Sequence, residues 1–232
     1  MKKIFSLLTL TAVLATASAL LAAPAGKSDL ADQKSKSSYA LGQQIGKDLK
    51  ENGALLEPAL IADGLRDAFA GTSRLSEAEQ SEGMAKLQEG IMRAHLAKQK
   101  QLADKNQQEG KKFLAANAKK KGVKTTASGL QYQVVNKGKG KKAGPESTVT
   151  VHYRGTLIDD TEFDSSLKRG EPATFPVTGV IPGWVEALQL MKEGDKFNLV
   201  LPPELAYGER GAGDAIGPNA VLLFEVELLK VE

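Results

Sequence analysis

Cysteine and histidine, two side chains that often act in covalent catalysis and metal binding, are absent or scarce in this sequence. The chain of 232 residues has no cysteine, which rules out disulfides, thiol catalysis and cysteine-ligated metals. Its two histidines, His95 and His152, are too few to favour a histidine-based metal site or a Ser-His-Asp triad. We therefore expect no metal site and no cofactor.

Aromatic side chains gather in the C-terminal half of the chain instead. There are seven phenylalanines, four tyrosines and one tryptophan, and seven of these aromatics lie in or beside short motifs: Tyr153, Phe163, Phe175, Trp184, Phe197, Tyr207 and Phe224. Each has a purely structural reading when taken alone. A tryptophan is most often part of a core, Asp164 after a strand can stabilise a turn, and Tyr207 before Gly208 can mark only a turn. Their joint order along the chain carries more information.

The elements that hold these residues alternate apolar and polar positions from about residue 125 onward. Such alternation is typical of strands with one covered face, and it occurs at 130–134, 149–153, 197–201 and 222–228. Residues 182–190 predict one short helix, which begins at a proline and ends before Gly194. The sequence therefore predicts an α+β domain in which this helix covers the apolar face of an antiparallel sheet.

Two further features of this half have structural readings. Phe197 lies on an alternating strand, and we place it in the sheet core and outside any pocket. The segment 138–140 has the sequence GKG, but it lacks the strand–turn–helix context of a phosphate-binding loop. We interpret it as a hairpin turn.

Six motifs stand in the order and spacing of the FKBP domain: 151–157 (VHYRGTL), 163–166 (FDSS), 180–184 (VIPGW), 191–194 (MKEG), 205–208 (LAYG) and 216–219 (IGPN), the last followed by 224–229 (FEVELL). Residues 125–232 therefore resemble the FKBP-type peptidyl-prolyl cis-trans isomerases, in which the sheet wraps over one short helix. The activity implied is rotation about X-Pro bonds, whose barrier is about 18–20 kcal/mol. Such a catalyst needs a water-poor pocket and fixed donors that hold the twisted amide better than the planar one.

The resemblance also implies roles for individual residues. Trp184 would form the pocket floor. Asp164 would sit at the rim, held by Tyr153 and Arg169, with Lys168 as a rival to Arg169, and Tyr207 would offer its hydroxyl to the substrate carbonyl. The implied catalytic residues are Tyr153, Asp164 and Tyr207, and the implied substrate-binding residues are Phe163, Arg169, Phe175, Val180, Ile181, Trp184, Ile216 and Phe224.

Three positions depart from the family's usual pattern. Ala173 stands where many members have a pocket-edge aromatic, Leu205 replaces a common tyrosine, and Ala212 stands where the best-known members have histidine. These changes leave the floor intact and open the rim. Isomerase activity is therefore expected to carry over more readily than tight macrolide binding.

The front of the chain is helical in pattern. Apolar residues recur every four positions at 41, 45 and 49, a second helix fits 57–70, and Ser76 with Glu79 forms a capping box that opens a long helix over 76–121. Its apolar stripe ends near Leu96, so we expect its second half to be solvated. This layout resembles the macrophage infectivity potentiator (Mip)-like branch of the family. Burying the stripes predicts a homodimer through residues 35–96, with a monomeric three-helix cap as the alternative.

The first residues are typical of an export signal. Lys2 and Lys3 precede an apolar run over 4–23 and then small residues, as in a secretory signal peptide. The alternative is a membrane anchor, but the most apolar part, 4–14, is shorter than the about 20 residues that span a bilayer. We expect a signal peptide at 1–23, a helical dimerisation domain at 26–96, a connecting helix at 97–122 and an isomerase domain at 123–232. The expected location is the periplasm, with the outer-membrane surface as an alternative.

Positive charge is concentrated in the middle of the chain. Residues 98–142 contain thirteen lysines and two acids, a net charge of +11. Such a run is most often a solvated face, and weak contact with anionic surfaces is the alternative reading, while no nucleic-acid partner is expected. The expected function is isomerisation that assists folding of exported proteins, on proline-containing unfolded or partly folded chains, with chaperone activity from the dimer cleft. The alternative is a dimeric holding chaperone or surface-binding protein with incidental isomerase activity.

Overall fold

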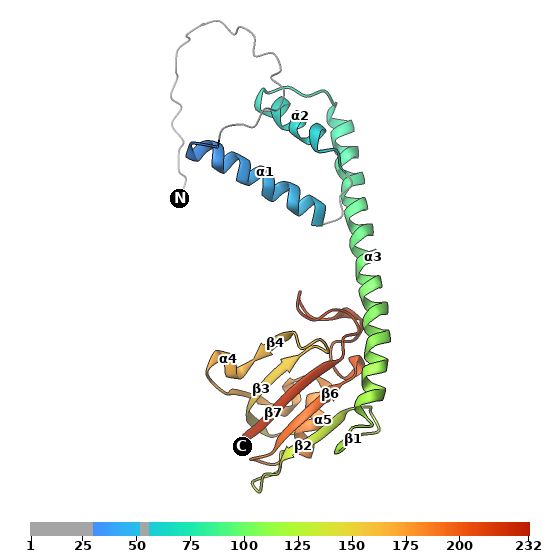
Figure 1. Ribbon diagram of the computed structural model, residues 1–232, viewed down its shortest axis with the longest axis vertical. Helices are drawn as coiled ribbons and strands as arrows, with labels where there is room; N and C mark the ends of the chain where they lie inside the picture. Colours follow the sequence, from blue (N-terminus) through green and yellow to red (C-terminus); the bar gives the residue numbers. More distant parts are fainter. Residues whose placement is uncertain (1–29, 52–55) are drawn as a thin grey trace, which may run out of the picture. The chain divides into compact units, whose positions relative to one another are not determined.

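The computed structural model describes residues 30–51 and 56–232 (Figure 1). The predicted signal peptide at 1–23 lies outside these residues. The chain divides into two units, Met1–Glu51 and Asn52–Glu232. In the first unit, α1 (Gln33–Glu51) forms where the four-residue apolar spacing predicts a helix, and it has no buried residue. Among the described helices, none is long and apolar enough to cross a bilayer.

The second unit begins with helices and continues as a sheet domain. Its helices are α2 (Pro58–Phe69), α3 (Glu77–Asn117), α4 (Ser166–Arg169) and α5 (Pro182–Leu190), and its 3-10 turns are η1 (Val177–Gly179), η2 (Pro203–Leu205) and η3 (Gly208–Arg210). The predicted capping box opens α3: the Ser76 N–H donates to Glu79 Oε2 at 2.8 Å, and the Glu79 N–H donates to Ser76 Oγ at 3.3 Å. The helix ends at Asn117, four residues before the predicted end, and is about 60 Å long at 1.5 Å per residue.

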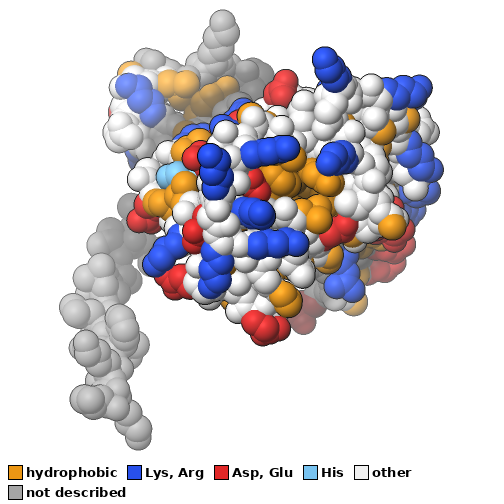
Figure 2. All heavy atoms as spheres, turned by 90° about the horizontal axis from the view of Figure 1, so that it is seen from below, with side chains coloured by type: hydrophobic (Ala, Val, Ile, Leu, Met, Phe, Trp, Pro, Cys, Tyr) orange, Lys and Arg blue, Asp and Glu red, His pale blue; other side chains and the backbone are white. Residues whose placement is uncertain are grey.

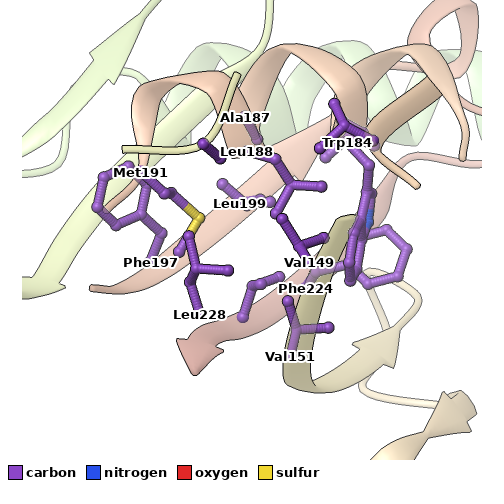
Figure 3. Close-up of a cluster of buried hydrophobic side chains, with 14 of the residues drawn as sticks. Val149, Val151, Trp184, Ala187, Leu188, Met191, Phe197, Leu199, Phe224 and Leu228 are labelled. Atoms are coloured by element: carbon purple, nitrogen blue, oxygen red, sulfur yellow. The ribbon is translucent and has the colours of Figure 1, made fainter. Parts of the chain in front are cut away.

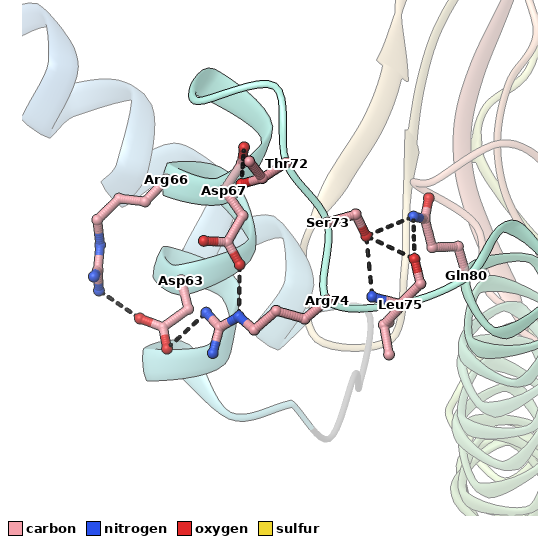
Figure 4. A network of polar contacts seen from close by, with 8 residues as sticks. All are labelled: Asp63, Arg66, Asp67, Thr72, Ser73, Arg74, Leu75 and Gln80. Atoms are coloured by element: carbon pink, nitrogen blue, oxygen red, sulfur yellow. Dashed lines mark hydrogen bonds and ion pairs between the residues drawn. The ribbon is translucent and has the colours of Figure 1, made fainter.

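The turn between α2 and α3 is bonded to both helices (Figure 4). Arg74 Nε donates to Asp67 Oδ2 of α2 at 2.6 Å, and a second guanidinium nitrogen lies 3.2 Å from Asp63 Oδ2. On the other side, Gln80 Nε2 of α3 donates to Ser73 Oγ at 2.9 Å. Exposed ion pairs contribute little individually, so their main effect is to fix the course of this turn.

The second half of α3 is not solvated on all sides, which corrects the prediction. Leu102, Asn106, Gly110, Leu114 and Asn117 share one face of the helix, and that face contacts the sheet domain. Asn117 Nδ2 donates to the Gln131 side chain at 2.9 Å, and Gln131 Nε2 donates to the Leu114 carbonyl at 3.0 Å. Between Leu102 and Leu114 the contact uses amide side chains and a glycine, so the face lacks a continuous apolar stripe and hydrophobic periodicity does not reveal it.

Within the described residues, seven strands form one antiparallel sheet: β1 (Val123–Thr125), β2 (Gln131–Asn136), β3 (Thr148–Thr156), β4 (Glu162–Ser165), β5 (Ala173–Pro176), β6 (Lys196–Leu201) and β7 (Leu222–Val231). The order is β1-β2-β6-β7-β3-β4, and β5 also pairs with β3. One edge of β3 therefore bonds to β7, while β5 and β4 bond in turn along the other edge.

The segment 138–140 is not a hairpin turn, and that prediction is wrong. β2 pairs with β1 and β6, so the chain leaving β2 crosses over to reach β3. On the way, the Gly138 N–H donates to Asp195 Oδ1 at 2.6 Å and the Gly140 N–H donates to the Glu193 carbonyl at 3.2 Å. A Cβ on Gly138 would lie 2.0 Å from that carbonyl oxygen. The two glycines therefore allow the segment 138–140 to pack closely on the loop at 193–195.

The core lies between α5 and the concave face of the sheet (Figure 3). Trp184, Leu188 and Ala187 of α5 pack on the alternating apolar residues of the strands, and Met191 follows the helix into the same core. The strand residues buried below about a twentieth of their surface include Val149, Val151, Phe197, Leu199, Leu201, Val226 and Leu228. Each fully buried side chain of this size contributes about 1.5–3 kcal/mol, and Phe197 lies in the core as predicted.

Candidate functional site

The site begins with a glycine that lets two aromatic rings meet. Gly155 of β3 lies opposite Phe224 of β7 and Asp164 of β4 in the register of the sheet. A Cβ on Gly155 would lie 2.7 Å from the Phe163 ring and 2.9 Å from the Phe224 ring. Because no side chain fills this space, Phe163 and Phe224 meet edge to face with their ring centroids 5.5 Å apart.

Trp184 lies beneath these rings, at the start of α5. Gly183 lets the helix approach β6, since a Cβ there would lie 2.5 Å from Leu201. The indole is 4% exposed, and its centroid lies 5.2 Å from the Phe224 ring and 5.3 Å from the Tyr153 ring, both nearly perpendicular. Its N–H has no hydrogen-bond partner among the described residues. The rings of Tyr153, Phe175 and Phe224 surround the indole, so its surroundings are mostly apolar.

A half-open cavity of about 500 Å³ lies over Trp184. Its lining contains ten of the eleven predicted site residues: Tyr153, Asp164, Tyr207, Phe163, Phe175, Val180, Ile181, Trp184, Ile216 and Phe224. Gly179, Ala212 and Ala215 also line it and were not among the predicted site residues. Gly179 and Ala215 directly precede predicted residues, but neither carries a side chain whose chemistry would have singled it out.

The polar rim is a linked group of three side chains. The Tyr153 hydroxyl donates to Asp164 Oδ2, and Arg169 donates to Asp164 Oδ1 and, at 2.9 Å, to the Tyr153 hydroxyl oxygen. Burial raises the pKa of Asp164, but the hydrogen bonds from Tyr153 and Arg169 lower it more, so this pKa lies below its ordinary value. Burial and the bond to Asp164 raise the pKa of Tyr153.

Arg169 contacts the carboxylate without lining the cavity, and its position follows from α4. Ser166, at the start of this helix, is fully buried; its Oγ accepts from the Tyr153 N–H at 2.8 Å and donates to the Tyr153 carbonyl at 3.2 Å. These bonds fasten α4 to β3. The rival residue, Lys168, lies 3.5 Å from Glu162 and is not among the bonded partners of Asp164.

Tyr207 lies between η2 and η3 and lines the same cavity. Tyr207 is 41% exposed, and its hydroxyl has no hydrogen-bond partner among the described residues. The hydroxyl is therefore free to donate to a bound molecule. Of the three departures from the family pattern, Ala212 lines the cavity, Ala173 pairs with Val151 in the sheet, and Leu205 packs on the core.

This arrangement suits binding and polarising a substrate. Its lining is mostly apolar and also includes Tyr207, whose hydroxyl is unpaired, and Asp164, whose carboxylate is held by Tyr153 and Arg169. Within 30–51 and 56–232, no group of three or more His, Cys, Asp or Glu side chains could hold a metal ion.

Comparisons with known proteins agree with this geometry. The chain matches the family model described as FKBP-type peptidyl-prolyl cis-trans isomerase over residues 139–229, and the model of the domain amino-terminal to it over residues 34–134. It is 40% identical to the outer membrane protein MIP of Legionella longbeachae, over 97% of each chain. It is 48% identical to the FKBP-type 22 kDa isomerase of Escherichia coli, over 85% of this chain and 95% of the relative.

A solved structure shows the same fold. The crystal structure of FkpA from Escherichia coli aligns with a TM-score of 0.73 and 43% identity, over 87% of this chain and 98% of that chain. The predicted combination of a helical front region and an antiparallel isomerase domain is thereby confirmed. The chain belongs to the FKBP-type peptidyl-prolyl cis-trans isomerases, in the group that contains the Mip and FkpA proteins.

Proposed function

We propose that the cavity over Trp184 is where this isomerase acts. The observation that carries the proposal is the arrangement of Tyr153, Phe224 and Phe175 around a buried indole, in a cavity that is also lined by the fixed carboxylate of Asp164 and by Tyr207. A proline ring of the substrate would rest on Trp184 between these rings. The X-Pro amide would then lie at the mouth, between Asp164 and Tyr207.

Catalysis follows from how the amide changes as it rotates. The planar amide has partial double-bond character, and the twisted form loses it and is less polar. A pocket with little water therefore favours the twisted form. The Tyr207 hydroxyl would hold the substrate carbonyl oxygen in its rotated position, and the Asp164 carboxylate would lie near the carbonyl carbon. Each 1.36 kcal/mol by which such contacts favour the twisted form contributes about tenfold in rate.

The single tryptophan of the chain offers a direct test of this location. Titration of the ¹⁵N-labelled chain with a short X-Pro peptide is expected to shift the one indole N–H signal together with the amides of Val180, Ile181 and Ile216. Shifts that concentrate instead on the opposite face of the sheet, at Asn198 and Gln133, with the indole signal unmoved, would show that the peptide binds elsewhere.

The helical front region supports a homodimer through residues 35–96 as part of the proposal. Its apolar side chains are exposed in a single chain: Leu41 is 62% exposed, Leu65 57%, Phe69 87%, Met84 60% and Leu96 59%. A second copy of the chain would bury them. The proposed layout is a signal peptide at 1–23, a dimerisation domain at 26–96, a connecting helix at 97–122 and an isomerase domain at 123–232.

A holding-chaperone activity is the second candidate, and the same exposed side chains favour it. An apolar cleft between two copies would bind unfolded chains, including those without proline. We place both activities outside the cytoplasm, because the first residues read as an export signal and the relative in Legionella longbeachae carries the name outer membrane protein. The clients would be proline-containing unfolded or partly folded exported proteins.

Weak contact with anionic surfaces is proposed for the basic segment 98–142. Figure 2 shows lysine and arginine side chains spread over one face of the molecule with acidic and hydrophobic side chains between them. The lysines of segment 98–142 are exposed, and exposed charges attract an anionic surface weakly and in a salt-sensitive way. Binding to anionic vesicles that persists in 0.3 M salt would contradict this assignment.

A further inference from the structure

One wall of the cavity is formed by a loop that is held together by its own backbone hydrogen bonds. We call residues 208–221 the pocket loop; it follows Tyr207 and carries Ala212, Ala215 and Ile216 into the cavity lining. The Ala212 N–H donates to the Ile216 carbonyl at 2.8 Å, and the Ile216 N–H donates back to the Ala212 carbonyl at 3.1 Å. The Asn219 N–H donates to the Gly208 carbonyl at 2.8 Å, which closes the loop beside Tyr207.

The outer side of the pocket loop rests on α3. Asn106 Nδ2 donates to the Pro218 carbonyl at 2.8 Å. A Cβ on Gly217 would lie 2.9 Å from Leu102 Cδ2 and 3.2 Å from Asn106 Nδ2, so the loop backbone lies directly against the helix. One turn further along, a Cβ on Gly110 would lie 2.8 Å from Val221 at the end of the loop. Three successive turns of α3 therefore contact this loop.

We propose that Asn106 and Leu102 of α3 are positioning residues for the isomerase site, acting through the pocket loop. The inference rests on the assignment of the cavity over Trp184 as that site. Because the loop is cross-bonded at 212–216 and at 208–219, a displacement at Pro218 moves Ile216 and the backbone beside Tyr207 together. Neither α3 residue reaches the cavity, and neither is among its lining residues.

The burial of Asn106 explains why its hydrogen bond to the Pro218 carbonyl can hold the pocket loop in place. This residue is partly buried between the helix and the loop, while Gln107 and Gln108 beside it on α3 are exposed. Without the amide donor, the Pro218 carbonyl would turn to water and the loop would gain freedom to move away from Trp184. Substrate affinity depends on that wall, so we expect the effect mainly in KM and in the preference for the residue before proline, and less in kcat.

The first test uses Asn106→Asp, which keeps the size of the side chain and removes the donor. We expect kcat/KM for an X-Pro peptide to fall about three- to tenfold, a size typical for one lost hydrogen bond. We also expect faster hydrogen exchange at the amides of Ala212, Ile216 and Asn219 and a change in Trp184 fluorescence. Gln108→Ala on the exposed side of the same helix is the control and is expected to change none of these.

The second test is a rescue. Gly217→Ala places a methyl group against Leu102 and is expected to displace the loop and lower kcat/KM. Leu102→Ala in the same chain removes the flexible side chain that it meets, and we expect it to restore at least half of the loss. The two substitutions change opposite sides of one contact. If the double variant recovers the rate but keeps the melting temperature of Gly217→Ala, the rate depends on the position of the loop and not on general stability.

Two results would overturn the inference. One is wild-type kcat/KM and unchanged loop exchange in Asn106→Asp; the other is a Gly217→Ala loss that Leu102→Ala does not relieve. A parallel assay of Tyr207→Phe keeps this outcome separate from a failure of the site itself. If Tyr207→Phe lowers the rate and the α3 variants do not, the cavity is the site and α3 is not coupled to it. If neither affects the rate, the assignment of the cavity fails.

Discussion

The ring of Tyr153 stands edge-on against the indole of Trp184, with centroids 5.3 Å apart and planes at 87°, while its hydroxyl donates to Asp164. One side chain thus joins the apolar floor of the cavity to its charged rim. Under the proposed assignment, a substrate on Trp184 would be held at a fixed offset from the carboxylate, which is the condition for stabilising one geometry of the amide over another.

The free hydroxyl of Tyr207 predicts the effect of its removal. Tyr207→Phe is expected to lower kcat/KM about three- to thirtyfold, because the proposed hydrogen bond to the rotated carbonyl would be lost. Stability should be unchanged, since the hydroxyl has no partner among the described residues. Tyr132→Phe is the matched control: Tyr132 stacks on Phe197 and lies outside the cavity lining, so its variant should keep the wild-type rate. If Tyr207→Phe has the same rate as Tyr132→Phe, the Tyr207 hydroxyl does not take part in catalysis.

The close approach of Phe163 and Phe224 depends on Gly155. Gly155→Ala would force a methyl group to within 2.7 Å of the Phe163 ring, so the rings must separate and the cavity must change shape. Overpacking of this kind typically costs about 1–3 kcal/mol. We expect a lower melting temperature and at least a tenfold loss of kcat/KM.

The control for this substitution is Gly144→Ala, where the nearest atom to a new Cβ is the Ser147 hydroxyl oxygen at 3.8 Å. This variant should resemble the wild type in both measurements. A Gly155→Ala chain with normal activity would show that the two rings do not need to touch for catalysis.

The charge of Asp164 predicts a pH dependence. The folded-state pKa of Asp164 lies below its ordinary value of about 3.9. Its carboxylate therefore adds stability above that ordinary value and loses this contribution as pH falls through the folded-state pKa. We expect Asp164→Asn to lower kcat/KM about three- to thirtyfold at neutral pH.

The ratio of wild-type to Asp164→Asn rates isolates this group from other titrations. It should stay constant from about pH 8 to about pH 5 and fall toward one only below about pH 4, as the carboxyl takes up a proton. A ratio that already falls near pH 6 would show that Asp164 lacks the stabilising bonds from Tyr153 and Arg169.

The exposed stripe of α1 predicts separable functions. Leu41→Glu with Ile45→Glu should convert a dimer to a monomer in light scattering, because each side chain would place a charge in the proposed interface. Isomerisation of a short peptide should be unchanged, whereas suppression of aggregation of a proline-independent client should be lost. Gln43→Glu on the other face of α1 is the control. A wild-type chain that is already monomeric at micromolar concentration would contradict the dimer.

The strands and α5 were predictable because each has a local pattern. Val149 and Val151 alternate with polar neighbours, and Pro182 marks the first turn of a helix that ends at Leu190 as predicted. The ten lining residues that were predicted came from the family resemblance, since Trp184 or Tyr207 alone gives no sign of a cavity. Gly179 and Ala215 were missed because they contribute backbone and a methyl group.

Two features could not be read from local pattern. The glycines of 138–140 predict a change of direction, but which strands pair is decided by the sheet as a whole, so the crossover from β2 to β3 was missed. On α3, Asn106, Gly110 and Asn117 are spaced as one helical face but are not apolar, so a hydrophobic period does not detect the contact with the pocket loop and β2. Their spacing of four and then seven residues, which places them on one helical face, is the available signal.

The measurement that tests the central claim most directly is NMR exchange of the cis and trans forms of an X-Pro peptide, with the wild-type chain and with the double variant Asp164→Asn, Tyr207→Phe. Uncatalysed exchange takes tens of seconds. We expect catalytic amounts of the wild-type chain to shorten it to well below about a second, and the double variant, with native Trp184 fluorescence, to lose at least about tenfold of that rate. A folded double variant that catalyses exchange at the wild-type rate would contradict the assignment of this cavity as the isomerase site.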